Sequence, residues 1–260
     1  MNYTRLLYSV EERICSIILN RPEKRNALDD QLIQELSHAF ISASKDTAVK
    51  VVILGANGNA FCAGADLDYL QKMSSFNFEE NLEDSKNLMR LFQTMYSMRK
   101  PIIAKVHGPA VAGGCGLATV CDIIVASEEA SFGYTEVKIG FIPAIVLTFL
   151  VRRIGEGKAR NLFLRGTIIS ARQAQELGLV NDVVPSANLS QEVHSIAESL
   201  CRDSSLISMG LIKEMFANMD GKTLGDMLGY AANVNAVTRM SEDCRKGIAA
   251  FLNKEKIEWK

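Results

Sequence analysis

The chain has 260 residues, of which 48% are apolar and 23% charged, and its formal net charge is −1, which is the composition of an ordinary globular protein. The lack of a basic excess argues against nucleic acid as the main partner. No apolar run is long enough to span a bilayer, and residues 1–12 mix charged and apolar side chains, so we expect a cytoplasmic protein without a secretory signal or a membrane partner.

The N-terminal segment predicts a hairpin followed by a helix. Residues 6–19 indicate two strands joined near Glu11 and Glu12. Asp29 or Asp30 is placed to cap a helix. The apolar face of that helix recurs at helical spacing and comprises Leu32, Ile33, Leu36, Phe40 and Ala43.

Further strand-like runs lie at 49–54, 102–107 and 122–126 and alternate with helical segments. This alternation is typical of an α/β architecture with right-handed crossovers. Residues 70–90 are the most polar and irregular part of the chain, and we expect a mobile helical lid there.

From Gly155 onward the pattern is mostly helical. Ser170 is a predicted N-cap for a short helix over 171–177, which Gly178 ends. Longer helices are expected over 188–202, 204–219 and 223–252.

The cysteines are scattered and form no C-x-x-C pair, which favours buried reduced thiols over a zinc site. They are Cys15, Cys62, Cys115, Cys121, Cys201 and Cys244.

Two glycine-containing loops each follow an apolar strand-like run. One spans residues 61–66 and the other opens the segment 112–120. The first amide groups of a helix have no partner within it, and glycine lets a ligand approach the backbone closely. Two such loops together can supply a pair of N–H donors to one oxyanion.

The two loops and the segment after them resemble the enoyl-CoA hydratase/isomerase (crotonase) superfamily. The segments that carry the resemblance are AFCAGADL at 60–67, GPAVAGGCGLATVCDIIVAS at 108–127 and ASFGYTEVKIGFIPA at 130–144. The resemblance extends from about Leu19 almost to the C-terminus. It implies an α/β core of repeated ββα units in a superhelix over residues 1–200. It also implies a helical region over 201–260 that packs subunits into a trimer or a dimer of trimers.

The resemblance assigns the oxyanion donors to the N–H groups of Ala65 and Gly113 and the acid–base carboxyl to Glu136. Typical hydratases of the family carry a second glutamate, where this chain has Gly116. One carboxyl group can act on both the water and the α-carbon, because it has an acceptor and a donor oxygen. Apolar neighbours indicate an apolar pocket that raises the Glu136 pKa; they are Val137, Ile139, Phe141 and Ile142.

The remaining site residues also follow from the resemblance. Coenzyme A, as part of the substrate rather than a bound cofactor, is expected to contact Lys24, Arg25, Ala63, Asp66 and Leu67. No metal is expected. Gly116 is predicted to leave room, and to remove a negative charge, beside a branched or acidic acyl chain. Lys138 is a candidate partner for such a carboxylate.

The expected activity is that of a lyase: a hydratase of a branched or carboxylated enoyl-CoA, similar to methylglutaconyl-CoA hydratases, in amino-acid or fatty-acid degradation. An isomerase that shifts a β,γ double bond to α,β by using Glu136 alone is the main alternative. A non-catalytic acyl-CoA-binding protein is another, which the retained glutamate and donor loops disfavour. A dinucleotide-binding enzyme would need a third glycine and an acidic residue that the motif lacks.

Overall fold

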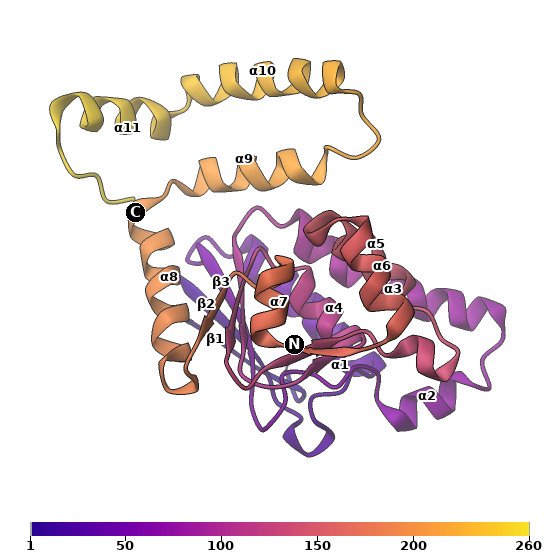
Figure 1. The fold of residues 1–260 in the computed structure, drawn as a ribbon. Coiled ribbons are helices and arrows are strands. Elements are labelled where there is room, and N and C mark those ends of the chain that lie inside the picture. Colours follow the sequence, from indigo (N-terminus) through magenta and orange to yellow (C-terminus); the bar gives the residue numbers. More distant parts are fainter. Residues whose placement is uncertain (1, 260) are drawn as a thin grey trace.

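A computed structural model describes residues 2–259 and contains a mainly parallel sheet with helices on both faces (Figure 1). In pairing order the strands are β1 (Leu6–Glu11), β2 (Ile14–Leu19), β3 (Val51–Ala56), β4 (Ile102–Val106), β6 (Ile123–Ser127) and β9 (Asp182–Val184). β1 and β2 form an antiparallel hairpin, and the other neighbours pair in parallel. The predicted hairpin and the three predicted strands are confirmed, with bounds shifted by at most two residues.

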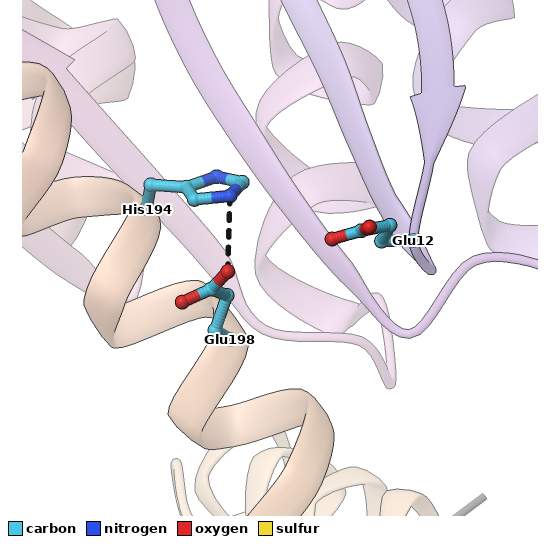
Figure 2. Close-up of side chains that lie close together, drawn as sticks. All are labelled: Glu12, His194 and Glu198. Carbon is cyan, nitrogen blue, oxygen red and sulfur yellow. Dashed lines mark ion pairs between the residues drawn. The ribbon is translucent and has the colours of Figure 1, made fainter.

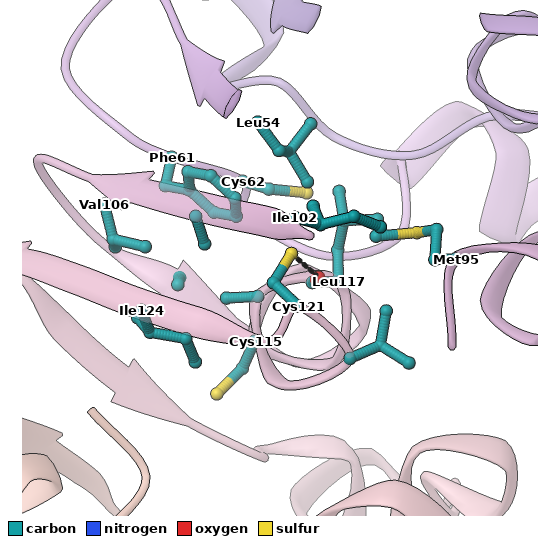
Figure 3. Packing of buried hydrophobic residues seen from close by; sticks show 14 of the residues in the cluster. Leu54, Phe61, Cys62, Met95, Ile102, Val106, Cys115, Leu117, Cys121 and Ile124 are labelled. Carbon is teal, nitrogen blue, oxygen red and sulfur yellow. Dashed lines mark hydrogen bonds between the residues drawn. The ribbon is translucent and has the colours of Figure 1, made fainter. Parts of the chain in front are cut away.

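Every residue of β3 is buried, and since successive side chains of a strand point in opposite directions, this strand is covered on both faces. In β3, Val52 and Leu54 join the larger core with residues of α1 (Asp30–Lys45), α3 (Phe78–Ser97) and α4 (Gly113–Thr119). Val51 and Ile53 pack instead against α8 (Leu189–Asp203). Figure 3 shows the part of the larger core around Cys115 and Leu117 of α4. The helix that opens with the glycine turn therefore lies on the face opposite α8.

A second, small sheet joins the glycine turn to the segment that carries Glu136. It consists of β5 (Ala110–Val111), β7 (Ser131–Gly133) and β8 (Ile168–Ser170), with β7 in the centre. β5 and β7 are parallel, so the backbone leaves both strands at the same end of the small sheet. The α4 turn and Glu136 lie immediately beyond that end.

Further helical elements are η1 (Pro22–Lys24), α2 (Leu67–Met73), η2 (Glu136–Ile139), α5 (Ala144–Ile154), α6 (Glu156–Arg165), α7 (Ala171–Leu177) and η3 (Ser186–Asn188). The predicted caps are confirmed. The Asp29 side chain accepts from the N–H of Leu32 at the start of α1. Ser170 forms a capping box with Gln173, and Gly178 ends α7 in the left-handed conformation.

The polar region 70–90 is confirmed as helical and is more regular than its sequence indicates. Asn77 and Glu80 form a capping box that starts α3. That helix then buries Leu91, Phe92 and Met95 in the larger core. Its C-terminal half is therefore fixed by packing, and motion of the α2–α3 segment stays a prediction.

The last helices form an arm that stands away from the sheet (Figure 1). It consists of α9 (Leu206–Ala217), α10 (Leu224–Met240) and α11 (Glu242–Asn253). The single helix expected over 223–252 is broken at Ser241, whose side chain caps α11. The boundary expected between residues 200 and 201 falls inside α8, which packs on the sheet. None of the helices within 2–259 has the length and apolarity that crossing a membrane requires.

Gly114 fixes how closely the first turn of α4 approaches the loop that follows β3. A Cβ at this position would lie 2.3 Å from the Cys62 carbonyl oxygen and 2.7 Å from the Cys62 Cβ. The nearest atom belongs to the backbone, so it cannot move aside as a flexible side chain could. Only glycine permits this contact between the two loops.

We predict that Gly114→Ala destabilises the chain by about 1–3 kcal/mol, because the added methyl group forces the two loops apart. Gly157→Ala is the matched control, since Gly157 lies in helix α6 and a Cβ there would meet nothing within 4 Å. That control should be stabilising by about 0.5–1 kcal/mol, because alanine favours helix over glycine. Urea unfolding of both variants measures the difference, and shifts in the same direction would contradict the prediction.

Candidate active site

The two glycine-containing loops lie against each other. Cys62 and Ala110 form a parallel bridge, and the Val111 N–H donates to the Cys62 carbonyl at 3.0 Å. A Cβ on Gly64 would be 2.9 Å from the Ala112 Cβ and 3.6 Å from the Gly113 nitrogen. The loop after β3 and the turn into α4 thus form one surface.

Each loop presents an unpaired N–H group on this surface. The Gly64 carbonyl accepts from the Leu28 N–H at 2.7 Å, and the N–H of Ala65 belongs to the same peptide unit and points the opposite way. Gly113 is the first residue of α4, so its N–H has no acceptor within the helix. Neither N–H donates to any backbone or side-chain acceptor within residues 2–259. The pair forms a candidate oxyanion hole.

Ala112, the residue before Gly113, has a strained backbone. Its φ of 52° and ψ of −127° lie in a region that L-residues other than glycine rarely occupy. Its N–H donates to the Gly133 carbonyl of β7 at 2.7 Å. This bond holds the strained residue in place and ties the turn to the chain that leads to Glu136.

Glu136 is buried, with 8% of its surface exposed. Its Oε2 atom lacks a hydrogen-bond partner. Burial raises the pKa of its carboxyl group, as the sequence predicts. Burial also raises the pKa of the Cys115 thiol to about 12, and the nearby Glu136 carboxylate contributes to that shift. The Gly133 carbonyl, three residues before Glu136, accepts from the Ala112 N–H, so the segment that carries this carboxyl group adjoins the turn into α4.

The apolar residues that follow Glu136 lie at the surface of this chain, whereas Glu136 itself is buried. Val137, Ile139, Phe141 and Ile142 are all exposed in this chain, Ile139 to 71%. The short helix η2 turns the Glu136 side chain inward and the next residues outward. The environment of Glu136 includes Cys115 and the fully buried Tyr134, whose hydroxyl bonds Thr119 at 2.6 Å.

Gly116 does not leave an open space, which corrects the steric part of that expectation. A Cβ there would lie 2.4 Å and 3.0 Å from the two Cγ atoms of Val146 and 3.3 Å from Phe92. Val146, from α5, fills the volume beside the glycine. What Gly116 changes is the charge, because no second carboxyl group accompanies Glu136 at this position.

The residues expected to contact coenzyme A gather around the first loop, with one correction. Lys24 and Arg25 are exposed, the Lys24 ammonium pairs with Asp68 at the start of α2, and the Arg25 carbonyl accepts from Ala63 at 3.0 Å. Leu67 is 80% exposed beside them. The Asp66 side chain, in contrast, is buried, caps α2 and pairs with a buried arginine, so it is not available to a ligand.

That arginine, Arg21, was not recognised from the sequence. It is 5% exposed and forms ion pairs with Asp29 and Asp66. A single arginine before a proline carries no pattern that predicts burial.

Lys138 is exposed, and its side chain lies beside Gly166 at the end of α6.

A cluster of potential metal ligands and a cavity both lie elsewhere. Glu12, His194 and Glu198 bring their ligand atoms within 4.8 Å of one another, but all are exposed, and α8 lies on the sheet face opposite α4 (Figure 2). A cavity of about 410 Å³ opens at the C-terminal end of α4, lined by Thr119 and by residues of α5 and α9. Neither feature belongs to the candidate site.

The arrangement suits reactions that place negative charge on a carbonyl oxygen. Two fixed N–H donors stabilise such charge without reorganising, and their effect is largest where water is excluded. A buried carboxyl group with a raised pKa can move a proton at the adjacent carbon. Together they can stabilise and protonate an enolate.

Comparisons with known proteins agree with this chemistry. The sequence profile described as "Enoyl-CoA hydratase/isomerase" matches residues 9–260. A Thermus thermophilus protein named provisionally as an enoyl-CoA hydratase is 42% identical over 93% of this chain and 95% of its own. The 2,3-dehydroadipyl-CoA hydratase of Escherichia coli is 33% identical over 99% of each chain. The structure of an enoyl-CoA hydratase from Bacillus anthracis has a TM-score of 0.91 at 31% identity over 99% of each chain.

We predict a characteristic pH dependence of stability from the raised pKa of Glu136. The native state holds this proton at pH values where the unfolded chain has lost it, so this group's contribution to stability falls as the pH rises above the ordinary glutamate pKa of about 4.3. Glu136→Gln removes the titration. The unfolding free energy of the variant relative to wild type should therefore increase from pH 4 towards neutrality, as measured by urea unfolding.

Glu83→Gln provides the control. A hydrogen bond from Arg90 lowers the pKa of the exposed Glu83 carboxyl group. The relative stability of this variant should decrease slightly over the same pH range. A flat difference curve for Glu136→Gln would contradict the raised pKa of the buried Glu136 carboxyl group.

Proposed function

This chain belongs to the enoyl-CoA hydratase/isomerase family, and from that premise we propose that it adds water to the double bond of an α,β-unsaturated acyl-CoA thioester. The observation that carries the proposal is the buried Glu136 carboxyl group, whose Oε2 atom has no hydrogen-bond partner. The Gly133 carbonyl, three residues before Glu136, accepts from the Ala112 N–H at the turn into α4. The free amide of Gly113 opens that same turn. We thus assign the activity to three groups on three separate segments: the Ala65 N–H, the Gly113 N–H and the Glu136 carboxyl group.

In the proposed reaction, the thioester oxygen accepts hydrogen bonds from the N–H groups of Ala65 and Gly113. Glu136 takes one proton from water as the water oxygen bonds to the β-carbon and the double bond becomes an enolate. The same carboxyl group then delivers that proton to the α-carbon, and the thioester carbonyl re-forms. The raised pKa supports this role, because it brings proton uptake and release by Glu136 closer in free energy.

We propose a branched or carboxylated acyl chain as the substrate, similar to methylglutaconyl-CoA. Gly116 supports this because it removes one negative charge that would repel a substrate carboxylate. The similarity to 2,3-dehydroadipyl-CoA hydratase, whose named substrate is the thioester of a dicarboxylic acid, points the same way. Lys138, exposed on the turn that carries Glu136, is the proposed partner of that carboxylate.

Isomerase activity is the second candidate, and Gly116 favours it because it leaves Glu136 without a second carboxyl group. A single carboxyl group suffices to move a proton from one carbon to another, whereas hydration also requires a water held near the β-carbon. Product analysis separates the two, since only hydration adds the mass of water.

We also propose that the arm packs between subunits of a trimer or a dimer of trimers. No residue of α10 is buried within the chain, and Leu224 is 77% exposed. Apolar surface of this extent marks an interface.

The six free thiols support a reducing compartment, and we propose the cytoplasm.

The first functional prediction concerns Glu136. Glu136→Gln should lower kcat by about a hundredfold to ten-thousandfold while the affinity for the CoA ester is retained, because the amide keeps the shape but cannot exchange the proton. Steady-state kinetics and calorimetric binding test this. Turnover close to that of wild type would assign the proton transfer to another group.

The second functional prediction concerns substrate choice. Wild type should hydrate 3-methylglutaconyl-CoA faster than crotonyl-CoA, as followed by mass spectrometry of the products. The double variant Gly116→Glu/Val146→Ala should shift the preference toward crotonyl-CoA, because it restores the charge and the alanine makes room for it. Val146→Ala alone is the control for the added volume. The opposite ranking in wild type would contradict the proposed substrate class.

A further inference from the structure

Arg21 lies in the loop between β2 and η1 and joins two segments that are distant in sequence. Its guanidinium donates to the Ala27 carbonyl at 2.7 Å and pairs with Asp29 at 3.0 Å. On its other side it donates to the Asp66 carboxylate at 2.9 Å. These partners flank Leu28 on one segment and adjoin Ala65 on the other.

Leu28 and the Ala65 loop are held together by two backbone hydrogen bonds. The Leu28 N–H donates to the Gly64 carbonyl at 2.7 Å, and the Asp66 N–H donates to the Leu28 carbonyl at 2.8 Å. The peptide units on both sides of Ala65 are thereby fixed. The direction of the free Ala65 N–H depends on this pairing. Arg21 contacts both segments, through Ala27 and Asp29 on one and Asp66 on the other.

The two carboxylates that Arg21 contacts also begin helices. Asp29 caps α1 and Asp66 caps α2, each through its Oδ1 atom. Burial would raise the pKa of Asp66, but hydrogen bonds from Arg21 and from the Tyr69 and Asp68 amides outweigh it and lower that pKa. Asp66 therefore stays ionised, and one guanidinium sets where both helices start.

We propose that Arg21 is a positioning residue that aims the Ala65 N–H at the thioester oxygen. The inference rests on the proposed function, since it assigns Ala65 to the oxyanion hole. Lysine cannot replace Arg21, because a point charge does not reach three acceptors with the planar fork of a guanidinium.

The test compares Arg21→Lys and Asp66→Asn with wild type. Asparagine still caps a helix but cannot form the ion pair with Arg21. Asp66→Asn therefore tests the ion pair while the helix cap is kept. Each variant should lower kcat by roughly tenfold to a hundredfold, because small misplacements at a reacting centre are costly. KM should change by less than about threefold, since binding of the coenzyme A portion is unaffected.

Two further readouts separate positioning from general stability. Bound acetoacetyl-CoA, a β-keto thioester, ionises to an enolate that absorbs in the near ultraviolet, and its enolate fraction should fall in both variants. Hydrogen exchange at the Leu28 and Asp66 amides should accelerate by roughly tenfold or more, because those two hydrogen bonds open more often.

Arg153→Lys is the matched control. Arg153 is partly buried and donates to several backbone carbonyls, among them those of Leu179 and Cys121 at 2.7 Å each, beyond the C-terminal end of α4. This variant should lose stability but keep the kcat, the enolate fraction and the exchange rates of Leu28 and Asp66.

Wild-type kcat, enolate fraction and exchange rates in Arg21→Lys would overturn the inference and leave the proposed function standing. An identical profile in Arg153→Lys would also overturn it, because the losses would then reflect stability alone. If wild type itself neither hydrates thioesters nor ionises acetoacetyl-CoA, the proposed function fails and the role of Arg21 in catalysis fails with it.

Discussion

The candidate site depends on backbone hydrogen bonds among four segments, 27–29, 62–66, 110–112 and the end of β7 at Gly133. Leu28 bonds on both sides of Ala65, Cys62 bonds Val111, and Ala112 bonds Gly133. A peptide N–H can remain unpaired at a fixed position only if the peptide units around it are held by other bonds. The strain at Ala112 is tolerated for the same reason, because the neighbouring pairs determine its conformation.

The second requirement is one isolated carboxyl group. Glu136 is buried near the first turn of α4 without a partner for Oε2, and no second carboxyl group stands at position 116. Val146 fills the space there instead, so packing and charge change together at one position. Glu136 is therefore the one proposed proton-transfer group, and burial is the main cause of its raised pKa. Such a group suits either water addition or double-bond migration.

Arg21 links this local chemistry to the stability of the fold. Burying a guanidinium is unfavourable unless its charge is paired, and here two carboxylates supply the pairing. Because both carboxylates also cap helices, the same ion pairs hold the starts of α1 and α2 and the loop between β3 and α2. The arm is different, because none of the residues of α10 is buried by the rest of the described chain.

The sequence alone determined the features that depend on local spacing. The hairpin, the strands and the caps at Asp29 and Ser170 follow from periodicity and capping chemistry over a few residues, and the structure confirms them. Burial of Glu136 was also predicted, but not that the apolar residues after it lie at the surface, where the short helix η2 places them. Only the tertiary structure decided that Val146 fills the space at Gly116, that Asp66 is committed to Arg21, and that α10 is left uncovered. Those outcomes depend on contacts between segments far apart in the chain, and neither periodicity nor motif spacing specifies such contacts.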